Sequence, residues 1–116
     1  MIEREVIAGD TFSLTYKYMP EGVLTDMPEA YNIKVGLHTE GGSLVRVYSY
    51  LAGEIKNPDK GIYRWTIDYD TSKNLKGYII AEMMLYSSDK SVVVHCSEPI
   101  RIHVIPSLMN SEIEND

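Results

Sequence analysis

The chain has 116 residues, which is enough for one domain with a buried core and too few for two. Its hydrophobic fraction of 44% and charged fraction of 24% are ordinary for a globular domain, and no apolar run is long enough to span a membrane. The formal net charge of −6 argues against nucleic acid as a partner, because phosphate binding needs a basic surface.

Residues 3–51 are predicted to form four strands. The first, residues 3–7, ends in a tight turn at Gly9 and Asp10. Residues 11–18 and 31–39 then alternate cleanly between apolar and polar positions, as half-buried strands do. Their inward positions are Phe12, Leu14, Tyr16, Tyr18, Tyr31, Ile33, Val35 and Leu37. Residues 43–51 show no clear inward face, which favours an edge strand or one covered on both sides.

The connections in this half differ in character. Glu40-Gly41-Gly42 is predicted to close a hairpin, because the glycines supply positive φ. Residues 19–30 show neither a helical nor a strand period, and both a plain crossover and a contact surface remain open for this loop. Residues 54–57 are a candidate for a short extra strand.

The strand near Trp65 offers the largest apolar face in the chain. A turn at Pro58, Asp59 and Gly61 precedes it. The side chains that share one face are Tyr63, Trp65, Ile67 and Tyr69. Because this face carries the only tryptophan, we predict that it lies in the core and that the strand is central in the sandwich.

The second half continues the pattern. Residues 70–77 are predicted to make one helical turn held in the end of the sandwich by Leu75. Residues 78–86 are apolar on both faces apart from Glu82, so this strand is central in its sheet or binds something with one face. After a turn at 88–90, residues 91–105 close the fold, and Pro99 is predicted to break them into two strands.

Together these elements predict an all-β sandwich of seven or eight antiparallel strands at roughly ten-residue spacing. It occupies residues 1–106 as a single domain. Residues 107–116 are acidic and without a period, and are predicted to be a disordered tail.

The sequence carries no motif of a known active site, neither a Gly-rich phosphate loop nor a Gly-x-Ser-x-Gly elbow nor His-Glu-x-x-His. His95 and Cys96 are strand neighbours and point to opposite faces, so they share neither an ion nor a catalytic role. Cys96 is also the only cysteine, which excludes an intrachain disulfide. If the strand continued, Asp68 and Asp70 would point to the same side, where two carboxylates could bind calcium. Two solvated carboxylates at a strand end are the commoner case. We expect no enzyme, no metal and no cofactor.

The nine tyrosines are too many for the core alone. Tyrosine is favoured at interfaces, so an exposed group such as Tyr48 and Tyr50 would mark a protein interface or a sugar platform. The alternative is that tyrosine fills half-buried sheet surface. With the second face of residues 78–86 included, the candidate interface residues are Tyr48, Tyr50, Tyr78, Ile80, Met84 and Tyr86.

Asp59-x-Gly61-x-Tyr63 resembles the tyrosine corner of immunoglobulin-like domains, in which the tyrosine hydroxyl returns to backbone just upstream. Trp65 stands where antibody domains have a cysteine. The resemblance implies an immunoglobulin-like sandwich without the antibody disulfide.

A second resemblance covers most of the chain. It consists of Gly9-Asp10-Thr11 near the start, Leu75-x-Gly77-Tyr78 leading into Ala81-Glu82, and Ile100-Arg101-Ile102-His103-Val104 at the end. These segments are similar to small phage and prophage virion proteins, including the N-terminal immunoglobulin-like domain of phage baseplate upper proteins. Gly77 is followed directly by Tyr78, so the spacing here is one residue shorter than in that family. The members of the family share no catalytic residues.

The resemblance implies a structural role in a phage tail or baseplate, through contacts with itself as a homo-oligomer and with other virion proteins. Residues 1–5 are charged and contain no apolar signal segment, so we expect the protein in the bacterial host cytoplasm or in the virion, without membrane insertion. The alternative function is a carbohydrate-binding sandwich module that uses exposed tyrosines.

Overall fold

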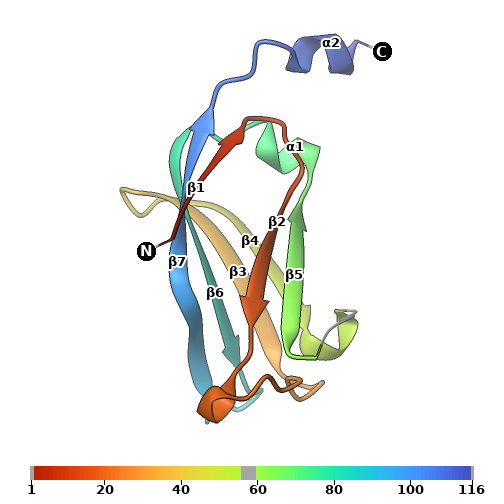
Figure 1. Ribbon diagram of the computed structural model, residues 1–116, viewed down its shortest axis with the longest axis vertical. Coiled ribbons are helices and arrows are strands. Elements are labelled where there is room, and N and C mark those ends of the chain that lie inside the picture. Colours follow the sequence, from red (N-terminus) through yellow and green to blue (C-terminus); the bar gives the residue numbers. More distant parts are fainter. Residues whose placement is uncertain (1, 56–59, 116) are drawn as a thin grey trace.

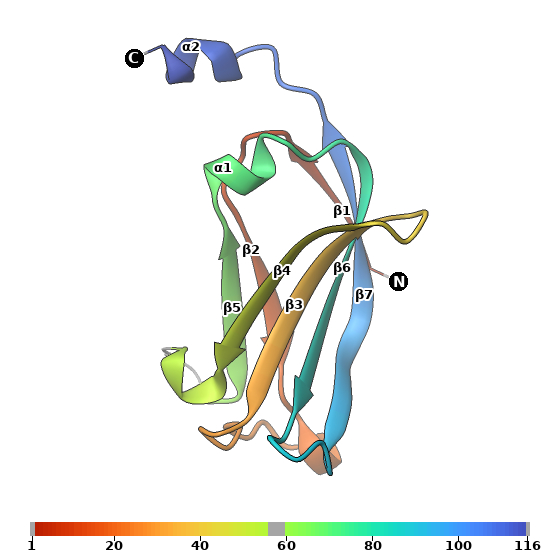
Figure 2. The ribbon, with the colours of Figure 1, turned by 180° about the vertical axis from the view of Figure 1, so that it is seen from behind.

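The computed structural model describes residues 2–55 and 60–115, with the backbone alone at 96–98. Seven strands are present in these residues, and they form two sheets packed face to face, so the predicted all-β sandwich is confirmed (Figures 1 and 2). The five-stranded sheet has the order β1-β7-β6-β3-β4, and the two-stranded sheet pairs β2 with β5. The strands are β1 (Ile2–Ile7), β2 (Phe12–Lys17), β3 (Asn32–Thr39), β4 (Leu44–Leu51), β5 (Ile62–Ile67), β6 (Gly77–Tyr86) and β7 (Val93–Ile105).

The core lies between the sheets and is built from the alternating inward positions. On β2 and β3 these are the predicted residues Phe12, Leu14, Tyr16, Ile33, Val35 and Leu37, all buried. From β6 and β7, Ile79, Leu85 and Ile102 complete the core with almost no exposed surface. Burial of such side chains is the main stabilising term of the fold, at roughly 1.5–3 kcal/mol each.

The Trp65 strand, β5, buries the predicted face: Tyr63, Trp65 and Ile67 are each less than 5% exposed. Its predicted central position is wrong, because among the described residues β5 pairs only with β2, in the two-stranded sheet. Tyr69 is not on the strand either, since β5 ends at Ile67 and α1 (Tyr69–Ser72) begins there. Alternation tells which face is buried, but it carries no information on how many strands lie alongside. Pro58 and Asp59 of the predicted turn lie outside the described residues.

Two further expectations about strand pairing are corrected. The pairs β2–β5, β3–β4, β3–β6 and β6–β7 are antiparallel as predicted, but β1 runs parallel to β7, with Ile2 beside Ile100 and Ile7 beside Ile105. The turn at Gly9 sends the chain to the other sheet, so no hairpin fixes the direction of β1 against its neighbour. Pro99 does not split β7; the β6–β7 register shifts between Ala81 and Met83 instead, so the ladder absorbs the proline as an irregularity.

The connections are close to expectation. The chain turns at Gly9 with φ +99° and at Gly42 with φ +92°, and β4 is an edge strand of its sheet. The strand β6 lies between β7 and β3, as its two apolar faces indicated. The single helical turn α1 precedes Leu75, which is 2% exposed and closes one end of the core.

Short 3-10 turns occupy two other connections. One, η1 (Pro20–Gly22), lies in the long loop, and η2 (Ala52–Glu54) follows β4. No strand is present at 54–55, and residues 56–57 of the proposed extra strand lie outside the described residues. In the segment for which disorder was predicted, the chain forms the short helix α2 (Asn110–Glu114) beyond the end of the sandwich (Figure 1).

The immunoglobulin-like assignment stays a prediction. The order β7-β6-β3-β4 opposite β2-β5 is compatible with the order G-F-C-C′ opposite B-E in variable-type domains. The backbone just upstream of Tyr63, at residues 56–59, lies outside the described residues, so the tyrosine-corner bond stays a prediction. Within the described residues the Tyr63 hydroxyl has a different partner. It accepts a hydrogen bond from the Met27 N–H at 2.6 Å, 36 residues away in sequence.

Candidate functional site

The loop of residues 19–30 is fastened to the start of β5 through several groups. Met27 is 4% exposed and donates its N–H to Tyr63, while Asp26 Oδ1 accepts the Gly61 N–H at 2.9 Å. Gly61 has φ +74°, and a Cβ there would lie 2.7 Å from Thr25 N. Burial raises the pKa of Tyr63, so its hydroxyl stays protonated and accepts through a lone pair. The part of the 19–30 loop that contacts β5 is a crossover between the strands. Val23 in the same loop is 64% exposed and is available for contact.

The outer face of β6 holds four of the candidate interface residues. Tyr78 is 38% exposed, and its ring stacks on His103 at 4.6 Å between centroids, with the Arg101 guanidinium over it at 3.7 Å. Ile80 stands directly beside His38 and Arg101 in the sheet and is buried. Met84 and Tyr86 are half-buried.

Arg101 is the centre of a polar cluster on this face. Its guanidinium bonds Glu40 at 3.1 Å and Glu3 at 3.2 Å, and the Glu40 bond raises the pKa of the guanidinium. His103 lies 3.7 Å from Glu5. The hollow among these residues has a volume of about 290 Å³. The cluster holds three carboxylates, Glu3, Glu5 and Glu40, against the one guanidinium of Arg101, so its formal charge is negative.

Tyr48 and Tyr50 lie on the opposite, inner face of the same sheet. Tyr48 is half-buried and donates its hydroxyl to Thr71 Oγ1 at 3.1 Å, while Tyr50 is 37% exposed and its ring lies 5.3 Å from that of Trp65. Trp65 Nε1 is buried and has no hydrogen-bond acceptor, and the Trp65 ring is tilted by 57° against that of Tyr50. The two tyrosines and the β6 residues therefore do not share one surface.

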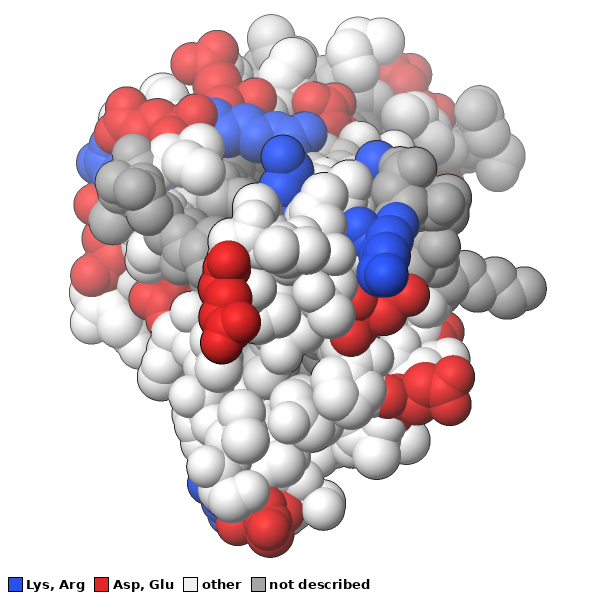
Figure 3. All heavy atoms as spheres, turned by 60° about the horizontal axis from the view of Figure 1, so that its bottom comes forward, with Lys and Arg blue, Asp and Glu red and all other residues white. Residues whose placement is uncertain are grey.

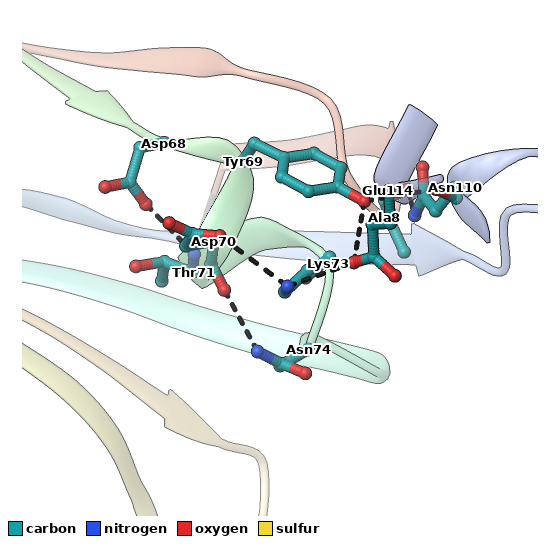
Figure 4. Close-up of polar contacts among 9 residues, drawn as sticks. All are labelled: Ala8, Asp68, Tyr69, Asp70, Thr71, Lys73, Asn74, Asn110 and Glu114. Carbon is teal, nitrogen blue, oxygen red and sulfur yellow. Dashed lines mark hydrogen bonds and ion pairs between the residues drawn. The ribbon is translucent and has the colours of Figure 1, made fainter. Parts of the chain in front are cut away.

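At the end of the sandwich that Leu75 closes, α1 and α2 meet in a polar network (Figure 4). Asp68 caps α1 by accepting the Thr71 N–H at 2.9 Å, which lowers the pKa of Asp68. Asp70 instead lies 3.6 Å from Lys73, so the two aspartates have different partners and the calcium arrangement is not formed.

Helix α2 is held in this network by two residues. Glu114 accepts from the Tyr69 hydroxyl at 2.9 Å and from Lys73 Nζ at 3.0 Å, and these bonds lower the pKa of Glu114. Asn110 donates to Ala8 O at 2.8 Å, beside Gly9, whose φ of +99° and closeness to Asn110 leave no room for a Cβ. These contacts could not be predicted from sequence, because polar residues at 110 and 114 are equally ordinary in a solvated tail.

A hollow of about 670 Å³ lies between this C-terminal segment and the end of the sandwich. It is lined by Ala8, Lys73, Asn74, Leu75, Lys76, Gly77, Val104, Pro106, Ser107, Asn110 and Glu114. Gly77 opens β6 here with φ +66°. The ionised groups of the lining are Lys73, Lys76 and Glu114. Lys73 pairs with Glu114 at 3.0 Å, so the formal charge that this pair leaves in the lining is the single cation of Lys76.

In the described part of the chain, no three His, Cys, Asp or Glu side chains are grouped to hold a metal ion. Likewise, none of the helices in residues 2–55 and 60–115 is long and apolar enough to cross a membrane. On the face in Figure 3, Lys and Arg occur among Asp and Glu, with uncharged residues between them.

No model of a known protein family matches the chain. No curated protein matches it either.

Proposed function

We propose that this chain is a non-enzymatic structural protein of a phage or prophage particle, in the tail or baseplate, that acts through protein–protein contacts. Its partners are other copies of the chain and other virion proteins. Its place is the virion and, before assembly, the host cytoplasm. The phage origin is supported by the sequence resemblance at Gly9-Asp10-Thr11, Gly77-Tyr78 and Ile100–Val104 alone.

The observation that supports contact with other proteins is the number of exposed apolar side chains on β4, of which Tyr50 lies on the inner face of the sheet and Val47 and Leu51 on the outer face. Apolar residues scattered singly are normal on protein surfaces, whereas contiguous ones mark interaction sites. The large side chains of β4 that are at least 37% exposed are Leu44, Val45, Val47, Tyr50 and Leu51. A second group, Leu108, Met109 and Ile113, projects from the C-terminal segment.

The experiment is to ask whether the chain is part of a particle. Particles are induced from the host that encodes the chain, purified through a density gradient, and probed with an antibody against the chain. We expect the chain in the particle fractions together with the major capsid protein, and cross-linked to tail proteins. A chain that stays with a cytoplasmic host marker and is absent from the particles contradicts the proposal.

The carbohydrate-binding alternative requires exposed tyrosines in a row. Among the described residues, the tyrosines that are more than 36% exposed are Tyr50 and Tyr78, and they lie on opposite faces of the five-stranded sheet. Both rings also contact other side chains of the protein. The arrangement therefore favours the assembly role.

A further inference from the structure

Strand β4 has one backbone edge that no described strand covers. It pairs with β3 on one side and lies at the end of the sheet order. Ala52 N bonds Tyr31 O on the β3 side, whereas Leu51 N points away from β3 and bonds the Glu54 carboxylate at 3.0 Å. Because successive residues of a strand direct their N–H and C=O groups to opposite sides, those of Val47, Ser49 and Leu51 face outward.

This edge carries few of the devices that usually prevent strand pairing. Natural edge strands are protected by proline, by charged side chains, by short length, by bulges or by a covering helix or loop. β4 has eight residues, Leu-Val-Arg-Val-Tyr-Ser-Tyr-Leu, with no proline and a single charge at Arg46. Its register shift against β3 lies at one end, near Leu44, and the ladder from Arg46 to Leu51 is regular.

We infer that the β4 edge pairs with the β4 edge of a second copy of this chain, antiparallel and about a two-fold axis near Ser49. The two five-stranded sheets then become one continuous sheet. Ser49 faces Ser49 of the second copy, and Val47 faces Leu51 of the second copy, so outward backbone groups meet outward backbone groups. This inference rests on the proposed assembly role and names one of its surfaces and partners.

Charge favours a second copy in this orientation. The edge carries a cation at one end, Arg46, and an anion just beyond the other end, Glu54. Antiparallel pairing brings Arg46 opposite Ala52 of the second copy, two residues from the opposite charge. Leu51 N–H then donates to Val47 O of the second copy, and the Glu54 carboxylate that covers it is released to pair with Arg46.

The test is the mass in solution, measured by light scattering behind a sizing column from micromolar to millimolar concentration. We expect wild-type chain to reach twice the 13.2 kDa of one copy. Ser49→Pro removes an outward N–H while leaving the β3 ladder intact, as edge proline does, and should raise the dissociation constant by about tenfold or more. Ser49→Ala is the matched control, because it keeps the N–H and should dimerise like wild type.

A charge exchange tests the same pairing without proline. Arg46→Glu should weaken the dimer, and Arg46→Glu combined with Glu54→Arg should restore it, because the ion pair re-forms with reversed signs. A wild-type chain that is monomeric at every concentration overturns the inference. So does a dimer that Ser49→Pro leaves unchanged, or a charge exchange without rescue.

These results separate the inference from the proposed function. A monomeric chain that is nevertheless present in purified particles removes the β4 pairing and leaves the virion role. A dimer with the expected response to Ser49→Pro, in a chain absent from particles, removes the virion role and leaves the pairing.

Discussion

At the scale of single residues, the buried bond between Tyr63 and Met27 ties the long loop to the core. Tyr63→Phe leaves the Met27 N–H buried without an acceptor, which should cost about 1–3 kcal/mol of unfolding free energy. Tyr31→Phe is the control, because no hydrogen bond is present at that hydroxyl among the described residues. Urea unfolding of the three proteins measures the difference, and equal losses in the two variants would contradict this account.

The glycine that lies under the same loop gives a second residue-scale prediction. Gly61→Ala places a methyl group 2.7 Å from the Thr25 backbone nitrogen and strains a φ of +74°, so neighbouring backbone must shift. We expect a loss of about 1–3 kcal/mol in urea unfolding. Gly36→Ala is the control with free space around the new Cβ and no positive φ. If the Gly61→Ala protein were as stable as that control, the loop backbone at Thr25 would move aside without a loss of stability, and this prediction would be wrong.

The burial of individual side chains could be read from the sequence far better than their partners could. Alternation on β2 and β3 identified Phe12 and Leu37 correctly, because the side-chain period of a strand does not depend on what packs against it. The Tyr63–Met27 bond could not be found in that way. It joins positions 36 residues apart, and only the docked loop brings them together.

At the scale of elements, α2 is held to the sandwich by Glu114. We expect Glu114→Gln to release α2, measured as faster hydrogen exchange over residues 106–115, while Glu112→Gln on the same helix has no effect. The pKa of Glu114 is lowered, so its contribution is present above the ordinary glutamate value of 4.5 and is lost as pH falls through the lowered pKa. The protection factor of the α2 amides in wild type, which is the intrinsic exchange rate divided by the observed rate at each pH, should therefore fall only in acid. Exchange that is already fast at neutral pH in wild type would instead support the disordered tail predicted from sequence.

Element positions separate what local sequence determines from what it does not. The two apolar faces of β6 predicted a strand that is central in its sheet or that binds something with one face, and the structure places it centrally, between β7 and β3. The tryptophan-bearing β5 was wrongly placed, since one strongly apolar face needs only an opposite sheet and no flanking strands. Of the candidate interface residues, Ile80 was chosen because it lies on the second apolar face of β6. It is buried beside His38 and Arg101, which lie on neighbouring strands.

At the scale of the whole molecule, the sandwich should fold without the C-terminal segment. Every residue of the buried core lies between Val6 and Val104, and α2 contributes none. A chain ending at Pro106 should therefore unfold in one cooperative step. The transition is monitored by the fluorescence of Trp65, which is 4% exposed in the fold. A chain ending at Ile100 is the comparison, because it loses the buried Ile102 and Val104 and the part of β7 that pairs with residues 3–7 of β1. We expect that chain to show no folded baseline. If the chain ending at Pro106 also lacks a cooperative transition, then the Asn110 and Glu114 contacts belong to the folding unit itself, and the domain extends to the last described helix.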